Sequence, residues 1–317
     1  MSLPSEPSNF NRKFPSLYKA LQIIWKRERS VTEIIIHLSN ALGLMIVGHL
    51  LFSYLTTENL IAIFNSVDSE ILYYIAGGFI AQMIDGALGM AYGVTATTFL
   101  LSVGITPAAA SASVHASEVF TSGVSGYMHL KFGNVNSKLF KTLVIPGIIG
   151  AIPGAYVLSS LEEYSSMIKP IVSIYTLFLG VIIIRKALIK RMEKRQLKRV
   201  GVLALFGGYL DSIGGGGWGP IVSSTLIASG RHPKYTIGSV NLTEFFVSLA
   251  SSITFFTVIG LGYWQVIIGL ILGGVVAAPI AAKLANKLPV KSMMILVGMV
   301  IIIVSLRQII LGVPKFF

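Results

Sequence analysis

The sequence contains no cysteine, which excludes disulfide bonds, thiolate nucleophiles and cysteine-based metal sites. Charge is also scarce, because only 12% of the 317 residues are charged, against about 25% in an average soluble domain. There is no P-loop motif, so ATP bound by this chain would not supply energy. The five histidines show no metal-ligand spacing. We therefore expect no metal, no cofactor and no enzymatic activity.

Hydrophobic residues are abundant instead and make up 54% of the chain. Apolar runs at 31–55, 171–189, 266–282 and 293–311 are each long enough to cross a hydrocarbon core of about 30 Å. The sequence therefore predicts an all-α polytopic membrane protein.

Positive charge is abundant but unevenly placed. Five clusters, at 1–31, 131–141, 185–199, 231–234 and 283–291, hold 22 of the 25 Lys and Arg residues. The loops between them, at 56–70, 104–106, 159–166 and 257–265, hold none. This alternation is typical of cytoplasmic loops in a membrane protein rather than of a nucleic-acid surface. It predicts a multi-pass protein of the cytoplasmic membrane, with the N-terminus cytoplasmic and the C-terminus outside.

An internal duplication is the most informative pattern in the chain. The stretch from Asp85 recurs without a gap from Asp211, 126 residues later. Glu118 and Glu244 match at the same offset, and His115 stands opposite Asn241. A duplicated apolar chain with paired acids and glycine breaks is typical of a transporter built from internal repeats.

The charge pattern and the duplication together predict the organisation of the chain. Residues 1–30 are a basic cytoplasmic segment, either a helix on the membrane surface or a solvated tail, and 31–56 form an extra transmembrane helix. Residues 71–189 and 200–312 are two repeats, each with a broken helix pair followed by three spans. We expect the backbone to be unwound at 85–89 and at 211–219, where glycine frees it. Because each repeat makes an odd number of crossings, the repeats have inverted topology, and the substrate site lies where the breaks meet.

Two polar stripes follow the broken pairs. Helical spacing places Ser111, His115, Glu118, Ser122 and Ser125 on one face of a helix. The second copy has Asn241, Glu244, Ser248 and Ser251 on the corresponding face. A charge at bilayer depth costs about 2.5–3.5 kcal/mol, so these faces must meet protein or water. One interpretation makes Glu118 and Glu244 proton or cation sites, and the other makes them interhelical hydrogen-bonding groups.

The residues at the breaks also have two interpretations each. Asp85 and Asp211 either cap the following short helix or bind an ion or a proton. The glycine-rich run 214–219 either offers backbone N–H groups to an anion or lets helices pack closely. Tyr92 and Trp218 either line the same cavity or pack between helices.

The run from Gly207 to Pro220, GGYLDSIGGGGWGP, resembles the second-half signature of the TauE/SafE family, described as sulfite exporters. The first-half signature is less regular, since Met90, Ala91 and Val94 stand where more glycine and a proline are usual. The resemblance covers about residues 71–311. It implies export of a small sulfur-containing anion such as sulfite, sulfoacetate or a related organosulfonate.

We therefore predict a secondary transporter that moves such an anion by alternating access, with an anion channel or a uniporter for another small anion as the alternative. Coupling or gating is assigned to Asp85, Glu118, Asp211 and Glu244, and the two glutamates would couple transport to protons or, as the alternative, to Na⁺. The predicted substrate-binding residues are Gly89, Tyr92, Gly93, Ser113, His115, Ser117, Gly214, Gly215, Gly216, Gly217, Trp218, Gly219, Ser239, Asn241 and Thr243.

Overall fold

The computed structural model describes residues 65–88, 90–188, 197–284 and 289–312, together with residues 45, 58 and 61. It forms two compact units, Met1–Val67 and Asp68–Phe317, and the second is described here by itself. The predicted basic segment 1–30 and nearly all of the predicted span 31–56 lie outside the described residues, as does Gly89.

The described part of the second unit consists of helices and their connections, with no β-strand among its residues, as the sequence predicts. The helices are α5 (Ile71–Leu88), α6 (Tyr92–Ser102), α7 (Pro107–Lys131), α8 (Ser137–Ser160), η1 (Glu162–Tyr164), α9 (Ser165–Leu188), α10 (Val200–Gly214), η2 (Gly219–Ser223), α11 (Ser224–Ala228), α12 (Pro233–Ile259), α13 (Trp264–Leu284) and α14 (Val290–Gly312).

Among the described residues, five stretches are long and apolar enough to cross a membrane: Ser137–Ser160, Glu162–Leu188, Pro233–Ile259, Trp264–Ala281 and Lys291–Gly312. Helix α7 has 25 residues but is not among them, because its polar stripe lowers its hydropathy. Large apolar side chains such as Ile145, Ile171, Ile303 and Ile310 are exposed on the outside of the helical unit. Such a surface is compatible with lipid and costly in water.

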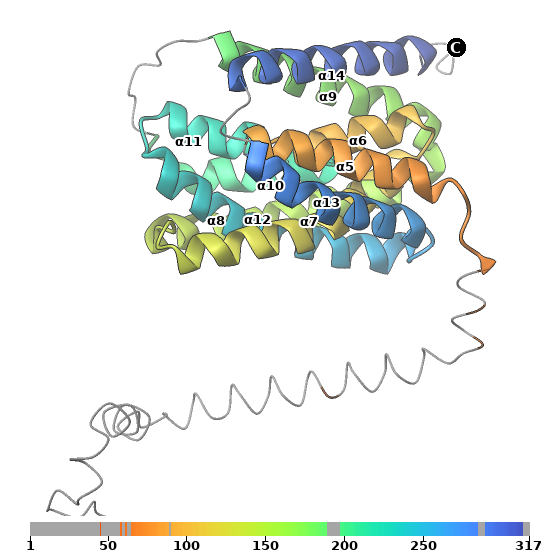
Figure 1. Ribbon diagram of the computed structural model, residues 1–317, viewed down its shortest axis with the longest axis horizontal. Coiled ribbons are helices and arrows are strands. Elements are labelled where there is room, and N and C mark those ends of the chain that lie inside the picture. The colour runs from red at the N-terminus through yellow and green to blue at the C-terminus, as the bar shows by residue number, and fades with distance from the viewer. Residues whose placement is uncertain are drawn as a thin grey trace, which may run out of the picture. The chain divides into compact units, whose positions relative to one another are not determined.

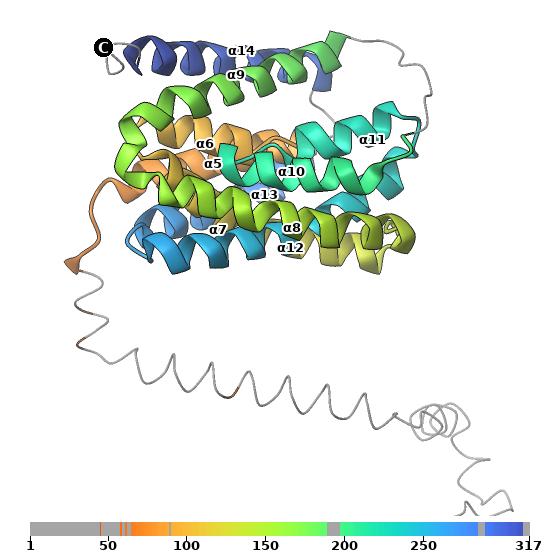
Figure 2. The same ribbon diagram turned by 180° about the vertical axis from the view of Figure 1, so that it is seen from behind.

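The helices are arranged in layers (Figure 1). The same layers are seen from behind in Figure 2. Helices α9 and α14 pack together at one side, and α7, α8 and α12 pack together at the other. The shorter helices α5, α6 and α10 lie between these layers. The short helices are therefore the ones that supply the centre of the unit.

The packing partners of the two halves correspond. Helix α5 lies on α13, and its counterpart α10 lies on α8, which is the counterpart of α13. The remaining counterparts pack on each other, α7 with α12 and α9 with α14. Each half thus packs its first helix against the second of the three long helices of the other half, α13 or α8.

The breaks do not begin where the sequence predicts. Helix α5 continues through Asp85 and Gly86 to Leu88, and α10 continues through Asp211 to Gly214. The expectation of unwound backbone was wrong for residues 85–88 and 211–214, which are helical, and was confirmed at Gly215–Gly217. In the first half the non-helical backbone lies at Met90–Ala91. Gly86 serves packing instead, because a Cβ there would lie 2.5 Å from the Cβ of Ala281 on α13. A small residue inside a helix allows this close approach at a cost of about 1 kcal/mol.

Candidate functional site

The two aspartates make the same contact in both halves. The Asp85 carboxylate accepts the backbone N–H of Tyr92 at 3.3 Å, and the Asp211 carboxylate accepts that of Trp218 at 2.8 Å. In each case the donor stands seven residues later, at the start of the next short helix. Of the two interpretations from sequence, the capping contact is therefore present in both copies.

The two breaks touch each other at the centre of the unit. A Cβ on Gly216 would lie 2.3 Å from the carbonyl carbon of Gly93. The Thr97 hydroxyl donates to the Gly215 carbonyl, and the Tyr175 hydroxyl donates to the Gly216 carbonyl at 3.0 Å. Gly216 has a φ of 143°, which side chains rarely adopt. Close backbone approach thus accounts for the glycines at this position.

Most N–H groups of the glycine-rich run already have acceptors. Those of Gly215 and Gly216 donate to the Asp211 carbonyl, and that of Trp218 donates to the Asp211 side chain. An anion near this run would therefore meet fewer free donors than the sequence suggests. Gly217 and Gly219 are the members of the run that line a cavity.

That cavity has a volume of about 290 Å³ and lies between the first break and two helices. It borders the second half of α7, which leads into the basic segment 131–141, and the first half of α12, which follows the basic segment 231–234. Predicted site residues that line it are Asp85, Tyr92, Gly93, Glu118, Gly217, Gly219, Asn241 and Glu244. Others that line it were not assigned as site residues: Gln82, Thr121, Ser122, Ser125 and His129. His129 continues the helical spacing of 118, 122 and 125, and that spacing was a signal by which it could have been found.

Carboxyl groups dominate the chemistry of this cavity. Glu118 accepts a hydrogen bond from the Ser248 hydroxyl at 3.2 Å, across the α7–α12 contact. A Cβ on Gly93 would lie 2.8 Å from Glu118 Oε1, so the first break reaches this carboxyl. Glu244 and Asp85 line the same space. An anion entering it meets three acidic side chains, and His129 is the one basic side chain among the lining residues.

The other predicted residues lie around the cavity or away from it. Those that do not line it are Ser113, His115, Ser117, Asp211, Gly214, Gly215, Gly216, Trp218, Ser239 and Thr243. The Ser117 hydroxyl is hydrogen-bonded to that of Tyr92 at 3.0 Å, and the Trp218 indole donates to the Val240 carbonyl at 3.3 Å. Ser239 and Thr243 donate to backbone carbonyls one turn earlier in α12. These contacts support the walls of the cavity.

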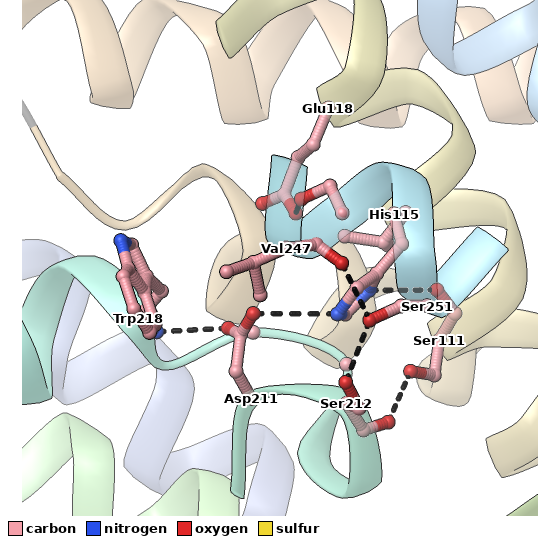
Figure 3. A network of polar contacts seen from close by, with 12 residues as sticks. Ser111, His115, Glu118, Asp211, Ser212, Trp218, Val247 and Ser251 are labelled. Atoms are coloured by element: carbon pink, nitrogen blue, oxygen red, sulfur yellow. Dashed lines mark hydrogen bonds and ion pairs between the residues drawn. The ribbon is translucent and has the colours of Figure 1, made fainter. Parts of the chain in front are cut away.

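His115 and Asp211 belong to a buried polar network formed with Ser111, Ser212 and Ser251 (Figure 3). The Ser111 hydroxyl donates to the Ser212 carbonyl at 2.6 Å, and the Ser212 and Ser251 hydroxyls are hydrogen-bonded at 2.7 Å. His115 Nε2 lies 3.3 Å from Asp211 Oδ2. All five residues are at most 1% exposed. The network joins the first half of α7 to the end of α10 and the second half of α12.

The His115 ring is oriented by its own helix. His115 Nδ1 lies 3.0 Å from the Ser111 carbonyl oxygen, which can only accept, so Nδ1 carries the hydrogen of this contact. The ring therefore presents Nε2 to Asp211.

A hydrogen-bonded cluster ties the loops near this network. Glu162 of η1 accepts from the Thr106 hydroxyl at 2.7 Å, at the start of α7, and from the Tyr263 hydroxyl at 3.3 Å, before α13. Burial is the main cause that raises the pKa of the Tyr263 phenol, so it stays protonated as a donor. Three connections are held together at this end of the unit.

Comparison with known proteins identifies the family. Residues 74–308 match the family model described as sulfite exporter TauE/SafE. The chain belongs to the TauE/SafE family. It is 42% identical over 245 residues to the probable membrane transporter protein YtnM of Bacillus subtilis, covering 74% of this chain and 80% of the relative. No solved structure matches it.

Family membership gives the broad function of the protein. A TauE/SafE protein with several apolar helices that could span a membrane is a multi-pass membrane transporter. Within the described residues, no group of three or more His, Cys, Asp or Glu side chains is placed to hold a metal ion. Because the family is one of transporters, the cavity is the candidate site for a transported solute.

Proposed function

We propose that this TauE/SafE protein exports a small sulfur-containing anion, sulfite or an organosulfonate, by alternating access between two inverted repeats. The observation that carries the proposal is the cavity beside the crossing of the two breaks, lined by acidic residues from both halves. The family description supports the class of substrate. Helix α5 packs on α13 in the same way as its counterpart α10 packs on α8, and this correspondence supports the proposal of two inverted repeats.

The charge pattern supports an orientation for this proposal. The cavity borders the ends of α7 and α12 next to the basic segments 131–141 and 231–234. Positively charged loops favour the cytoplasmic side, so the cavity would open to the cytoplasm. An exporter must load its substrate from that side.

The acidic lining supports proton coupling. An anion is repelled by ionised Asp85, Glu118 and Glu244 in a space of low dielectric, so it binds well only when carboxyls are neutral. We therefore propose that the anion and at least one proton occupy the cavity together. A complex that keeps net negative charge is still pushed outward, by about 2.3 kcal/mol per charge per 100 mV. Sodium bound between the carboxylates would neutralise them in the same way and is the alternative coupling ion.

The experiment is flux through purified protein in liposomes, with labelled sulfite, organosulfonates, sulfate and chloride under imposed pH, Na⁺ and voltage gradients. We expect saturable flux of a sulfur oxyanion that responds to the pH gradient. Because glutamine imitates a protonated glutamate, Glu118→Gln and Glu244→Gln should keep flux but weaken its response to the pH gradient. Glu163→Gln, at an exposed glutamate, is the matched control.

Each outcome bears on a different part of the proposal. No flux of any sulfur oxyanion rejects the substrate class. An unchanged response to pH in both glutamine variants rejects these residues as proton sites. Ion currents far above the turnover of a carrier would favour the channel alternative.

A further inference from the structure

The cavity and the buried polar network consist of corresponding residues. Asp85, Gly86, Ser125 and His129 line the cavity, and the residues 126 positions later are Asp211, Ser212, Ser251 and Phe255 of the buried side. In the other direction, Ile237 and Asn241 line the cavity, and the residues 126 positions earlier are Ser111 and His115. One set of positions thus exists in two copies.

The two copies differ in exposure. All six cavity positions are partly exposed. Their six counterparts are at most 1% exposed, and the Phe255 ring meets the His115 ring edge-on at 6.2 Å. The same surface of the repeat is therefore open in one copy and closed in the other.

From this correspondence we propose that the network around His115 and Asp211 is a second access site for the transported anion, closed in this structure. It rests on the proposed alternating access. When the first site closes, the second opens to the other side of the membrane and releases the same ion. The cluster of Glu162, Thr106 and Tyr263 lies at that end of the unit and helps hold it closed.

His115 and its counterpart Asn241 are one of the pairs of positions at which the two copies differ. His115 meets Asp211 at 3.3 Å, whereas Asn241 at the corresponding position donates to the Ser125 hydroxyl at 2.9 Å. Asparagine is shorter than histidine and does not reproduce the contact of Nε2 with Asp211. Replacing His115 with asparagine therefore leaves the buried Asp211 side chain without this partner, which favours the state in which water reaches it.

The absence of cysteine makes the test direct, because each introduced cysteine is a unique label. Ser125→Cys and Ser251→Cys form a matched pair, the same residue type at corresponding positions. Each is treated in membrane vesicles of either orientation with a maleimide that cannot cross the membrane. We expect Ser125→Cys to react from the cytoplasmic side and Ser251→Cys to be protected.

Two substitutions then exchange the distinguishing residues. His115→Asn should raise the labelling rate of Ser251→Cys from the outer side severalfold and lower that of Ser125→Cys from the cytoplasmic side. Asn241→His places an imidazole near Asp85 and should lower the labelling of Ser125→Cys. The double exchange should reverse the pattern of the unmodified pair.

The proposal is overturned if His115→Asn protein, purified as a stable single species, labels at both cysteines as the parent does. Should that variant fail to fold, the Asn241→His arm decides, and unchanged labelling of Ser125→Cys there overturns the proposal. Labelling needs no substrate, so a failed sulfite flux assay would reject the substrate and leave this result standing. Intact flux with unchanged labelling would reject the second site alone.

Discussion

The two breaks at the centre of the helical unit both interrupt a helix with backbone of positive φ, but they use different residues to do so. The first turns at Ala91, which has a φ of 101°, and Met90 and Ala91 line the cavity. The second uses Gly215, Gly216 and Gly217, all with positive φ, and is followed by Trp218, which is fully buried. Both breaks border the cavity, the first at Met90 and Ala91 and the second at Gly217. The comparison indicates that the second break leaves no room for a side chain, because a Cβ added at Gly215, Gly216 or Gly217 would lie 2.0–2.4 Å from neighbouring atoms.

The largest effect is expected from adding a methyl group to the second break. In Gly216→Ala the new Cβ would meet the Gly93 and Val94 backbone at 2.3–2.4 Å, at a φ that alanine resists. We expect a loss of about 3–5 kcal/mol in stability, from overpacking and backbone strain together. Thermal unfolding in detergent, followed by tryptophan fluorescence, measures it. Gly262→Ala, with no atom within 4 Å of the added Cβ, should be close to neutral, and equal effects of the two would contradict the crossing of the breaks.

An intermediate effect is expected from removing the capping aspartates. Asp85→Ala removes one capping hydrogen bond and should cost about 1 kcal/mol. Asp211→Ala also removes the buried partner of His115 and should cost about 3 kcal/mol. The corresponding asparagine variants keep a carbonyl oxygen for the cap and serve as controls. Equal losses in the two alanine variants, by the same unfolding measurement, would show that the His115 contact adds nothing.

The smallest effect is expected at the first break, and it is a gain. Ala91→Gly relieves a backbone conformation that costs alanine about 1 kcal/mol or more, so the melting temperature should rise. Ala76→Gly, at an exposed position inside α5, should lower stability by about 1 kcal/mol because glycine is a poor helix former. A fall in stability with Ala91→Gly would mean that the first break is packed as tightly as the second.

Much of this site could be predicted from the sequence, because it depends on short-range rules. The helical spacing of Glu118, Ser122 and Ser125 placed them on one face, and that face lines the cavity. The aspartates before the breaks suggested caps, and both caps are present. In such cases spacing along one helix or one turn decides the geometry.

The remaining features depend on contacts between distant segments. Gly86 looked like a point of unwinding, but its role is set by Ala281, which is far along the chain. The sequence suggested that the N–H groups of the glycine-rich run are free. In the structure the carbonyl and the side chain of Asp211 accept three of them. Nor could the duplicated sequence show which copy is open, because exposure depends on how the helices of the two copies pack against each other. His115 against Asn241 was the visible asymmetry, and its meaning required the position of Asp211.

The contact between Gly93 and Gly216 bears on how such a chain can change over evolutionary time. Each glycine occupies the space in which the other would place a side chain, and each half packs its first helix against the other half. Neither half therefore contains a complete core of its own. A fragment that ended between α9 and α10 would expose the backbone at Gly93 and the faces of α5 and α8 that the second half covers. After duplication, the two copies diverged at positions such as 115 and 241 and also at the crossing, where Met90 corresponds to Gly216, while Gly93 and its counterpart Gly219 are both glycine. The two repeats therefore depend on each other to complete their packing, although each is a copy of the same ancestral segment.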